Sequence, residues 1–316
     1  MNVEGKLAVS SSPHIRSKNS IQDTMLDVIL ALMPAAFAGV YFFGARAMSV
    51  MVISVASCVI FEFLWQKLTK RKVTIKDLSA VVTGMLLAYS LPASIPYWMV
   101  VVGAFVAIIV AKQFFGGIGQ NFMNPALCGR AFMLASFPVA MTAFPGNQMN
   151  IFQTDVVTTA TPLSGESLYT PNAFHFFLGF GKSGCIGEIC IVALLLGGAY
   201  LLFRKVISWR IPVSFIISVF LMTAFFGGGG LNAFEALFSG GVMLGAIFMA
   251  TDYTTSPVTF WGQIIMGAGC GVLTCVIRFW GGYPEGVTYA ILLMNALSPL
   301  IDKITVPWKF GEVRAR

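Results

Sequence analysis

The sequence predicts an all-α polytopic membrane protein, with about ten transmembrane helices in two inverted five-helix repeats. The first observation behind this prediction is composition: 57 % of the 316 residues are hydrophobic and only 10 % are charged. A soluble domain has roughly 25 % charged residues, so this chain lacks the charge needed to cover a water-facing surface. The second observation is that long apolar runs alternate with short polar connectors, which is typical of several membrane spans.

The apolar runs are long enough to span a bilayer, and they define the elements in chain order. The expected spans are residues 25–43, 48–68, 78–91, 97–115, 125–144, 185–203, 211–226, 233–250, 261–280 and 287–301. They divide the chain into an N-terminal segment (1–24), a first repeat (25–144), a polar insert (145–183), a second repeat (184–302) and a tail (303–316).

The two halves carry similar sequence features, which is why inverted repeats are expected. A basic residue, two aromatic residues and two glycines close one span at Lys112–Gly117 and another at Val276–Gly282. Because each half has five spans, the second half enters the membrane with the opposite orientation. Such repeats place a binding site near the midplane, where interrupted helices meet.

The basic residues fix the expected orientation. The net charge of +7 would suit nucleic acid, but the lysines and arginines lie in the head, in the connectors after the second and sixth runs, and in the tail. This distribution favours membrane orientation over nucleic-acid binding. It predicts that both termini are cytoplasmic and that the insert lies on the outer face. The six cysteines show no metal-ligand spacing, so we expect no zinc or iron–sulfur site.

Three stretches carry a resemblance to a known family. They are Ser12-Pro13-His14-Ile15-Arg16, the glycine-rich connector and following helix start at 116–130, and Asp155 to Leu163 in the insert. With these motifs the chain resembles the D subunits of Rnf complexes and, more distantly, the B subunits of the sodium-pumping NADH:quinone reductase. The resemblance covers nearly the whole chain and implies a multi-pass location in the bacterial cell (inner) membrane.

The resemblance implies a covalent flavin in the insert. In the family a flavin transferase esterifies the last threonine of an Asp-x-x-Ser/Thr-Gly-Ala-Thr motif with the phosphate of FMN. Asp155, Thr158, Ala160 and Thr161 match this motif, Thr161 is the implied acceptor, and Thr159 departs from the usual glycine. A threonine before proline is also biased away from helix, as an enzyme-accessible acceptor requires. The alternative is an ordinary polar outer loop.

The resemblance also implies a second, non-covalent flavin, riboflavin, within the spans. Gly116, Gly117 and Gly119 allow the main chain to approach a ligand closely, and the start of the next helix offers hydrogen-bond donors from Asn121, Asn124 and Arg130. The alternative is a tight turn between packed helices, where small residues are common.

Ionisable residues inside spans are costly and therefore indicate function. Asp27 and Glu62 are candidates for an ion or proton role, with an interfacial position as the alternative. Lys112 lies near a span end, where extension of its side chain to the membrane surface is an equally good interpretation. Asp252 lies in a polar break and is expected to line the central site.

The resemblance implies a redox subunit that works within a complex. The complex would move electrons between ferredoxin and NAD and couple them to Na⁺ or H⁺ transport, with membrane subunits A, E and G and iron–sulfur or flavin subunits B and C as partners. Two alternatives have no covalent cofactor: a secondary transporter or channel with the same repeats, and a passive membrane scaffold.

Overall fold

The computed structural model describes residues 20–144, 177–180, 183–227, 233–281 and 286–306. Helices make up the regular structure of these ranges, and no strand occurs in them, which confirms the predicted all-α class. The acceptor motif from Asp155 to Thr161 and the head motif from Ser12 to Arg16 lie outside the described residues.

The first half contains helices of unequal length. They are α1 (Ile21–Phe43), α2 (Ala45–Leu68), the 3₁₀ turn η1 (Ile75–Asp77), α3 (Ser79–Tyr89), α4 (Tyr97–Phe105), the π-helical continuation η2 (Val106–Gln113), α5 (Pro125–Ser136) and α6 (Pro138–Thr142). Ser20 begins α1 with a capping box, because its side chain and that of Asp23 each accept a hydrogen bond from the other's backbone N–H. Gly44, with φ of 69°, then separates α1 from α2.

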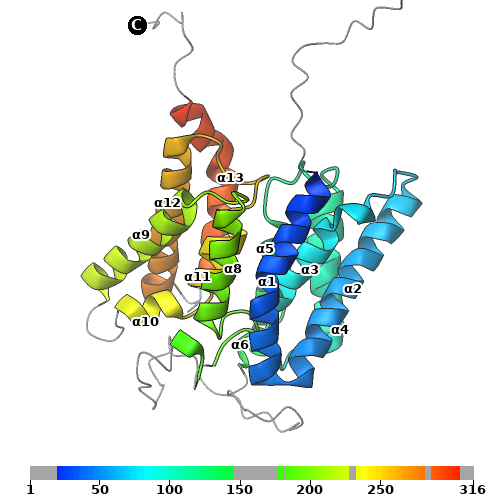
Figure 1. Ribbon diagram of the computed structural model, residues 1–316, viewed down its shortest axis with the longest axis horizontal. Helices are drawn as coiled ribbons and strands as arrows, with labels where there is room; N and C mark the ends of the chain where they lie inside the picture. The colour runs from blue at the N-terminus through cyan, green and yellow to red at the C-terminus, as the bar shows by residue number, and fades with distance from the viewer. Residues whose placement is uncertain (1–19, 145–176, 181–182, 228–232, 282–285, 307–316) are drawn as a thin grey trace, which may run out of the picture.

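The second half also consists of helices of unequal length. Its helices are α8 (Ile191–Phe203), α9 (Arg210–Phe226), α10 (Ala233–Phe238), α11 (Val242–Leu244), the π-helical η4 (Gly245–Met249), α12 (Phe260–Trp280) and α13 (Val287–Thr305). Figure 1 shows the two halves side by side, with α1 next to α8.

Some of the ten predicted spans are helices that could cross a membrane. Among the described helices, α1, α2, α12 and α13 are long and apolar enough to cross a bilayer, and four shorter apolar stretches (79–89, 97–113, 191–203 and 210–226) accompany them. The expected fifth and eighth spans are built from pieces. Pro138 divides α5 from α6, and Gly240 and Gly241, at φ of 63° and 74°, divide α10 from α11.

The halves meet through small residues and backbone contacts. A Cβ atom on Gly197 of α8 would lie 2.1 Å from the carbonyl oxygen of Ala31 on α1, so glycine permits this approach. The amide of Asn124 also donates to the Met249 carbonyl at 3.2 Å, which joins the start of α5 to the end of η4. The start of α1 and the end of α13 lie at one end of the bundle, and α6 lies at the other (Figure 1).

Candidate functional site

A cavity of about 510 Å³ lies between the two halves, at the end of the bundle where α1 begins. Most of its lining is apolar, with side chains such as Met25, Val82, Leu86 and Phe248. A smaller set of lining residues is polar: Thr24, Ser79, Thr83, Lys112, Asn121, Asn124, Thr251, Asp252, Tyr253 and Thr254. An apolar cavity of this size with a few polar groups has the character of a small-molecule site.

The glycine-rich connector after η2 forms one wall of this cavity. Gly116, Gly117 and Gly119 adopt φ of 119°, 100° and 85°, conformations that residues with side chains rarely adopt. Ile118 and Gly119 line the cavity, whereas Gly116 and Gly117 turn the chain just before it. Of the three glycines expected to allow a close approach to a ligand, Gly119 lines the cavity.

The two asparagines of the motif line the cavity and also build its wall. The Asn124 Oδ1 atom accepts hydrogen bonds from the N–H groups of Ala126 and Leu127, at 3.0 and 3.3 Å, and so caps the start of α5. The Asn121 amide donates to the Met123 carbonyl at 3.1 Å. The N–H groups of Ala126 and Leu127 at the start of α5 are thus bound by the protein itself, which differs from the expectation that the start of this helix receives the ligand.

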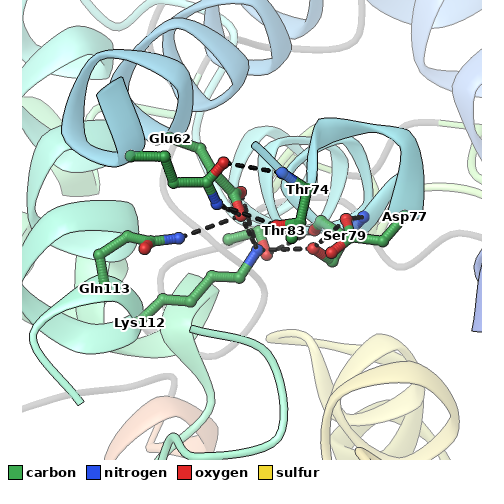
Figure 2. A network of polar contacts seen from close by, with 8 residues as sticks. Glu62, Thr74, Asp77, Ser79, Thr83, Lys112 and Gln113 are labelled. Carbon is green, nitrogen blue, oxygen red and sulfur yellow. Dashed lines mark hydrogen bonds and ion pairs between the residues drawn. The ribbon is translucent and has the colours of Figure 1, made fainter. Parts of the chain in front are cut away.

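Lys112 reaches the cavity from a buried polar network (Figure 2). Its ammonium donates to the two Glu62 carboxylate oxygens at 3.1 and 2.8 Å, and to the Ser79 hydroxyl at 2.6 Å. The side chains of Lys112 and Glu62 are only 3 % and 1 % exposed. The Lys112 side chain is therefore not extended outward into solvent, because it forms a buried ion pair with Glu62 inside the protein.

The π-helical geometry of η2 allows two consecutive side chains to serve the same carboxylate. The N–H groups of Phe114 and Gly117 donate to carbonyls five residues earlier, at 3.0 and 3.1 Å. With this wider turn the Gln113 amide also donates to Glu62, at 3.0 Å. Such π-helical turns often occur at functional sites.

Asp252 faces the same cavity from the connector between η4 and α12. Burial raises the pKa of its carboxyl group, while hydrogen bonds from Thr254 and Thr255 and the charge of Lys112 oppose that rise. Asp252 was predicted to line a central site near the midplane, whereas the cavity that it lines lies at the end of the bundle where α1 begins. The cavity thus has a cationic group on the first half and a carboxyl group on the second.

Other predicted residues lie elsewhere. Arg130 is on α5, but it does not line the cavity; its guanidinium lies 3.6 Å from the Glu188 carboxylate and 3.5 Å from the Cys185 sulfur. Asp27 accepts hydrogen bonds from Tyr200 at 2.9 Å and from Arg204 at 3.1 Å, which ties α1 to the end of α8. Asp27 and Glu62 therefore belong to separate clusters.

Sequence reasoning did not assign Lys112, Ser79 and Thr83 to the site. A signal for Lys112 was present, because a lysine within an apolar run is costly unless it has a buried partner. No comparable signal marks Ser79 and Thr83, because their place in the cavity depends on where α3 begins.

The cavity fits a flavin by its chemistry. An isoalloxazine ring is flat and largely apolar, with hydrogen-bonding atoms along its edges. The apolar lining matches the ring faces, and the amides, hydroxyls, ammonium and carboxyl group supply partners of both kinds for an edge. Among the described residues no group of His, Cys, Asp and Glu side chains could hold a metal ion.

Comparison with known proteins decides the family. The model of the NQR2, RnfD, RnfE family matches residues 8–311. The chain belongs to this family. The match includes both halves and the cavity residues, so the fold and the cavity described above are those of an NQR2, RnfD, RnfE family member.

Relatives of this family member match over almost their full length. The D subunit of a Na(+)-translocating ferredoxin:NAD(+) oxidoreductase complex from Acetobacterium woodii is 49 % identical over 318 residues, covering 99 % of this chain and 98 % of the relative. The D subunit of a proton-translocating ferredoxin:NAD(+) oxidoreductase complex from Clostridium ljungdahlii is 45 % identical over 322 residues, covering 97 % and 96 %. The D subunit of an ion-translocating oxidoreductase complex from Aliivibrio salmonicida is 36 % identical over 350 residues, covering 96 % and 98 %.

Proposed function

We propose that this chain is the flavin-carrying membrane subunit of an ion-translocating ferredoxin:NAD⁺ oxidoreductase complex. The observation that carries the proposal is the full-length similarity to D subunits, with 49 % identity to one of them. The cavity between the halves adds a physical reason, because its size and lining suit a redox ring. Two relatives of nearly equal similarity are named for different ions, so the proposal covers either Na⁺ or H⁺.

Two flavins belong to the proposal. FMN is attached as a phosphoester to Thr161 in the insert, with Asp155, Thr158 and Ala160 as the motif that a flavin transferase reads. A non-covalent flavin, riboflavin, occupies the cavity between the halves. When bound, these flavins accept and release single electrons, and the protein orients the rings and sets the charge around them.

The chain works with partner subunits in this proposal. The relatives are named as D subunits of oxidoreductase complexes, which supports the entry and exit of electrons through other chains. Membrane subunits A, E and G and the iron–sulfur or flavin subunits B and C are the proposed partners. The cavity lies at the end where α1 begins, which the distribution of basic residues assigns to the cytoplasm.

The covalent flavin is tested on the denatured protein. The wild-type chain is produced with a flavin transferase, separated on a denaturing gel, and viewed under ultraviolet light. We expect a fluorescent band and a flavin-modified peptide that contains Thr161 by mass spectrometry. Thr161→Val should remove the fluorescence, and the matched variant Thr159→Ala should keep it.

A wild-type peptide with unmodified Thr161, from cells that contain the transferase, would contradict this part of the proposal. A transporter or a scaffold would then account better for the chain, because neither needs a covalent cofactor.

The cavity flavin is tested with neighbouring valines of α3. Val82 lines the cavity and Val81 does not, although both side chains are half-buried against the core. Val82→Phe should place a ring in the cavity and lower the content of acid-extractable flavin several-fold, while the covalent flavin stays unchanged. Val81→Phe is the matched control and should retain both flavins. Equal flavin content in the two variants would place the non-covalent flavin outside this cavity.

A further inference from the structure

Lys112 is the cationic side chain at the wall of the cavity. Of the described residues that line this cavity, Lys112 alone carries a lysine or arginine side chain. The side chain is 3 % exposed, so water screens its charge poorly. A buried charge of this kind acts on its surroundings much more strongly than a surface lysine.

The ion pair is oriented relative to the cavity. Lys112 lines the cavity, whereas its partner Glu62 is not among the lining residues. The positive end of the pair is therefore nearer to a bound ring than the negative end. Gln66 and Gln113 also donate to Glu62, at 3.3 and 3.0 Å, which keeps the carboxylate in place behind the ammonium.

The ammonium needs no ligand to satisfy its hydrogen bonds. Its contacts go to both Glu62 oxygens and to Ser79, and Ser79 in turn donates to the Asp77 carboxylate at 2.7 Å. A group that is already fully bonded in this way influences a ligand through its charge. Binding of a ligand in the cavity then depends on the other lining residues.

We propose that the positive charge of Lys112 raises the reduction potential of a flavin bound in the cavity. Glu62 acts as the positioning residue, because it holds the Lys112 ammonium at the cavity wall. The inference rests on the proposed function, since it requires that a flavin bind there. Each electron that enters the ring from a partner subunit adds one negative charge. A fixed positive charge beside the ring favours the reduced form over the oxidised form.

The test measures the potential of the non-covalent flavin in the full chain, reconstituted in lipid nanodiscs. All variants carry Thr161→Val, so that the covalent flavin does not contribute to the spectrum. Lys112→Met removes the charge, and Lys112→Arg keeps it. The double variant Glu62→Leu with Lys112→Met removes both charges, and it serves if the single variant fails to fold because Glu62 is left without its partner.

Lys112→Met and the double variant should bind flavin and shift its equilibrium toward the oxidised form. At a fixed solution potential we expect the ratio of reduced to oxidised ring to fall about tenfold in Lys112→Met, which corresponds to ~59 mV for a one-electron couple. The fall should be smaller in the double variant, because the negative charge of Glu62 is removed as well. Lys112→Arg should stay within about threefold of the parent chain. A purely structural role for Lys112 would lower stability without this shift.

Three results would overturn the inference, and they are distinguishable. Flavin bound with an unchanged potential in Lys112→Met and in the double variant would leave the proposed function intact and remove the role of Lys112. Flavin lost from both, but kept by Lys112→Arg, would make Lys112 a binding group instead. A parent chain with Lys112 intact and no bound flavin would contradict the cavity flavin of the proposed function, and this inference with it.

Discussion

At the scale of single residues, one buried ion pair links three helical elements of the fold. Glu62 and Lys112 come from α2 and η2, and their contact at 2.8 Å links these elements to the start of α3 through Ser79. Such a pair is costly to desolvate, so the favourable contact largely offsets the loss of water around both charges. It is the removal of one partner that leaves a charge buried without compensation.

We expect the single variants Glu62→Leu and Lys112→Met each to lower the free energy of unfolding by about 3–5 kcal/mol. The double variant should lie close to the wild type, because two apolar side chains of similar size replace the pair. Thermal unfolding in detergent checks this, and additive losses in the double variant would show that the two side chains act independently.

In the cluster of Asp27, Tyr200 and Arg204, substitution of the two charged residues should lower the free energy of unfolding by unequal amounts. The Asp27 side chain is 9 % exposed, but that of Arg204 is 51 % exposed. Arg204→Met leaves a buried carboxylate with fewer donors and should cost about 1–3 kcal/mol. Asp27→Asn leaves an arginine that water can solvate and should cost under about 1 kcal/mol. Equal costs in unfolding experiments would argue against this difference in burial.

At the scale of helices, α1 and α8 depend on a glycine for their close approach. A Cβ atom at Gly197 would lie 2.1 Å from the Ala31 backbone oxygen, and a backbone atom cannot rotate away as a side chain can. Gly197→Ala should therefore force the helices apart and cost about 1–3 kcal/mol. At Gly184 the nearest atom to an added Cβ is 3.6 Å away. Gly184→Ala is the matched control, and an equal melting temperature for the two variants would contradict this packing argument.

The sequence predicted which segments are helical more accurately than it predicted where a helix is interrupted. The apolar runs of α1, α2, α12 and α13 are long, and their predicted ends agree with the structure to within a few residues. The runs at 125–144 and 233–250 contain Pro138 and the pair Gly240 and Gly241, where the helices stop. Hydropathy alone does not register these breaks, because proline and glycine are tolerated in membrane helices when neighbours satisfy the backbone.

The part of the candidate site that lies on a single connector, residues 116–124, could be proposed from the sequence. The glycines at 116–119 and the asparagines at 121 and 124 are close in sequence, and their turn chemistry is local. Lys112 and Ser79 join them only because α2, α3 and η2 pack around Glu62. Arg130, six residues after Asn124, instead extends to Glu188 in the second half. Contacts between segments that are distant in sequence therefore determine that Lys112 and Ser79 line the cavity and that Arg130 does not. No local sequence pattern predicts such contacts.

At the scale of the whole molecule, the positions of the helix ends allow a test of membrane topology. The start of α1 and the end of α13 lie at one end of the bundle, together with the cavity, and α6 lies at the other (Figure 1). The basic connector after α2 belongs to the first end, which the positive-inside rule assigns to the cytoplasm. The six native cysteines are buried or half-buried, so the wild-type chain gives a low labelling background.

Two introduced cysteines should report opposite faces of the membrane. Lys72 follows α2 and is exposed, and Val139 on α6 is 82 % exposed. In intact bacterial cells, a membrane-impermeant thiol reagent should modify Val139→Cys and spare Lys72→Cys. Inverted cell-membrane vesicles should give the reverse pattern. If Lys72→Cys were labelled from outside, the cavity would face the outer compartment, and electrons from a cytoplasmic donor would have no direct route to a flavin bound in it.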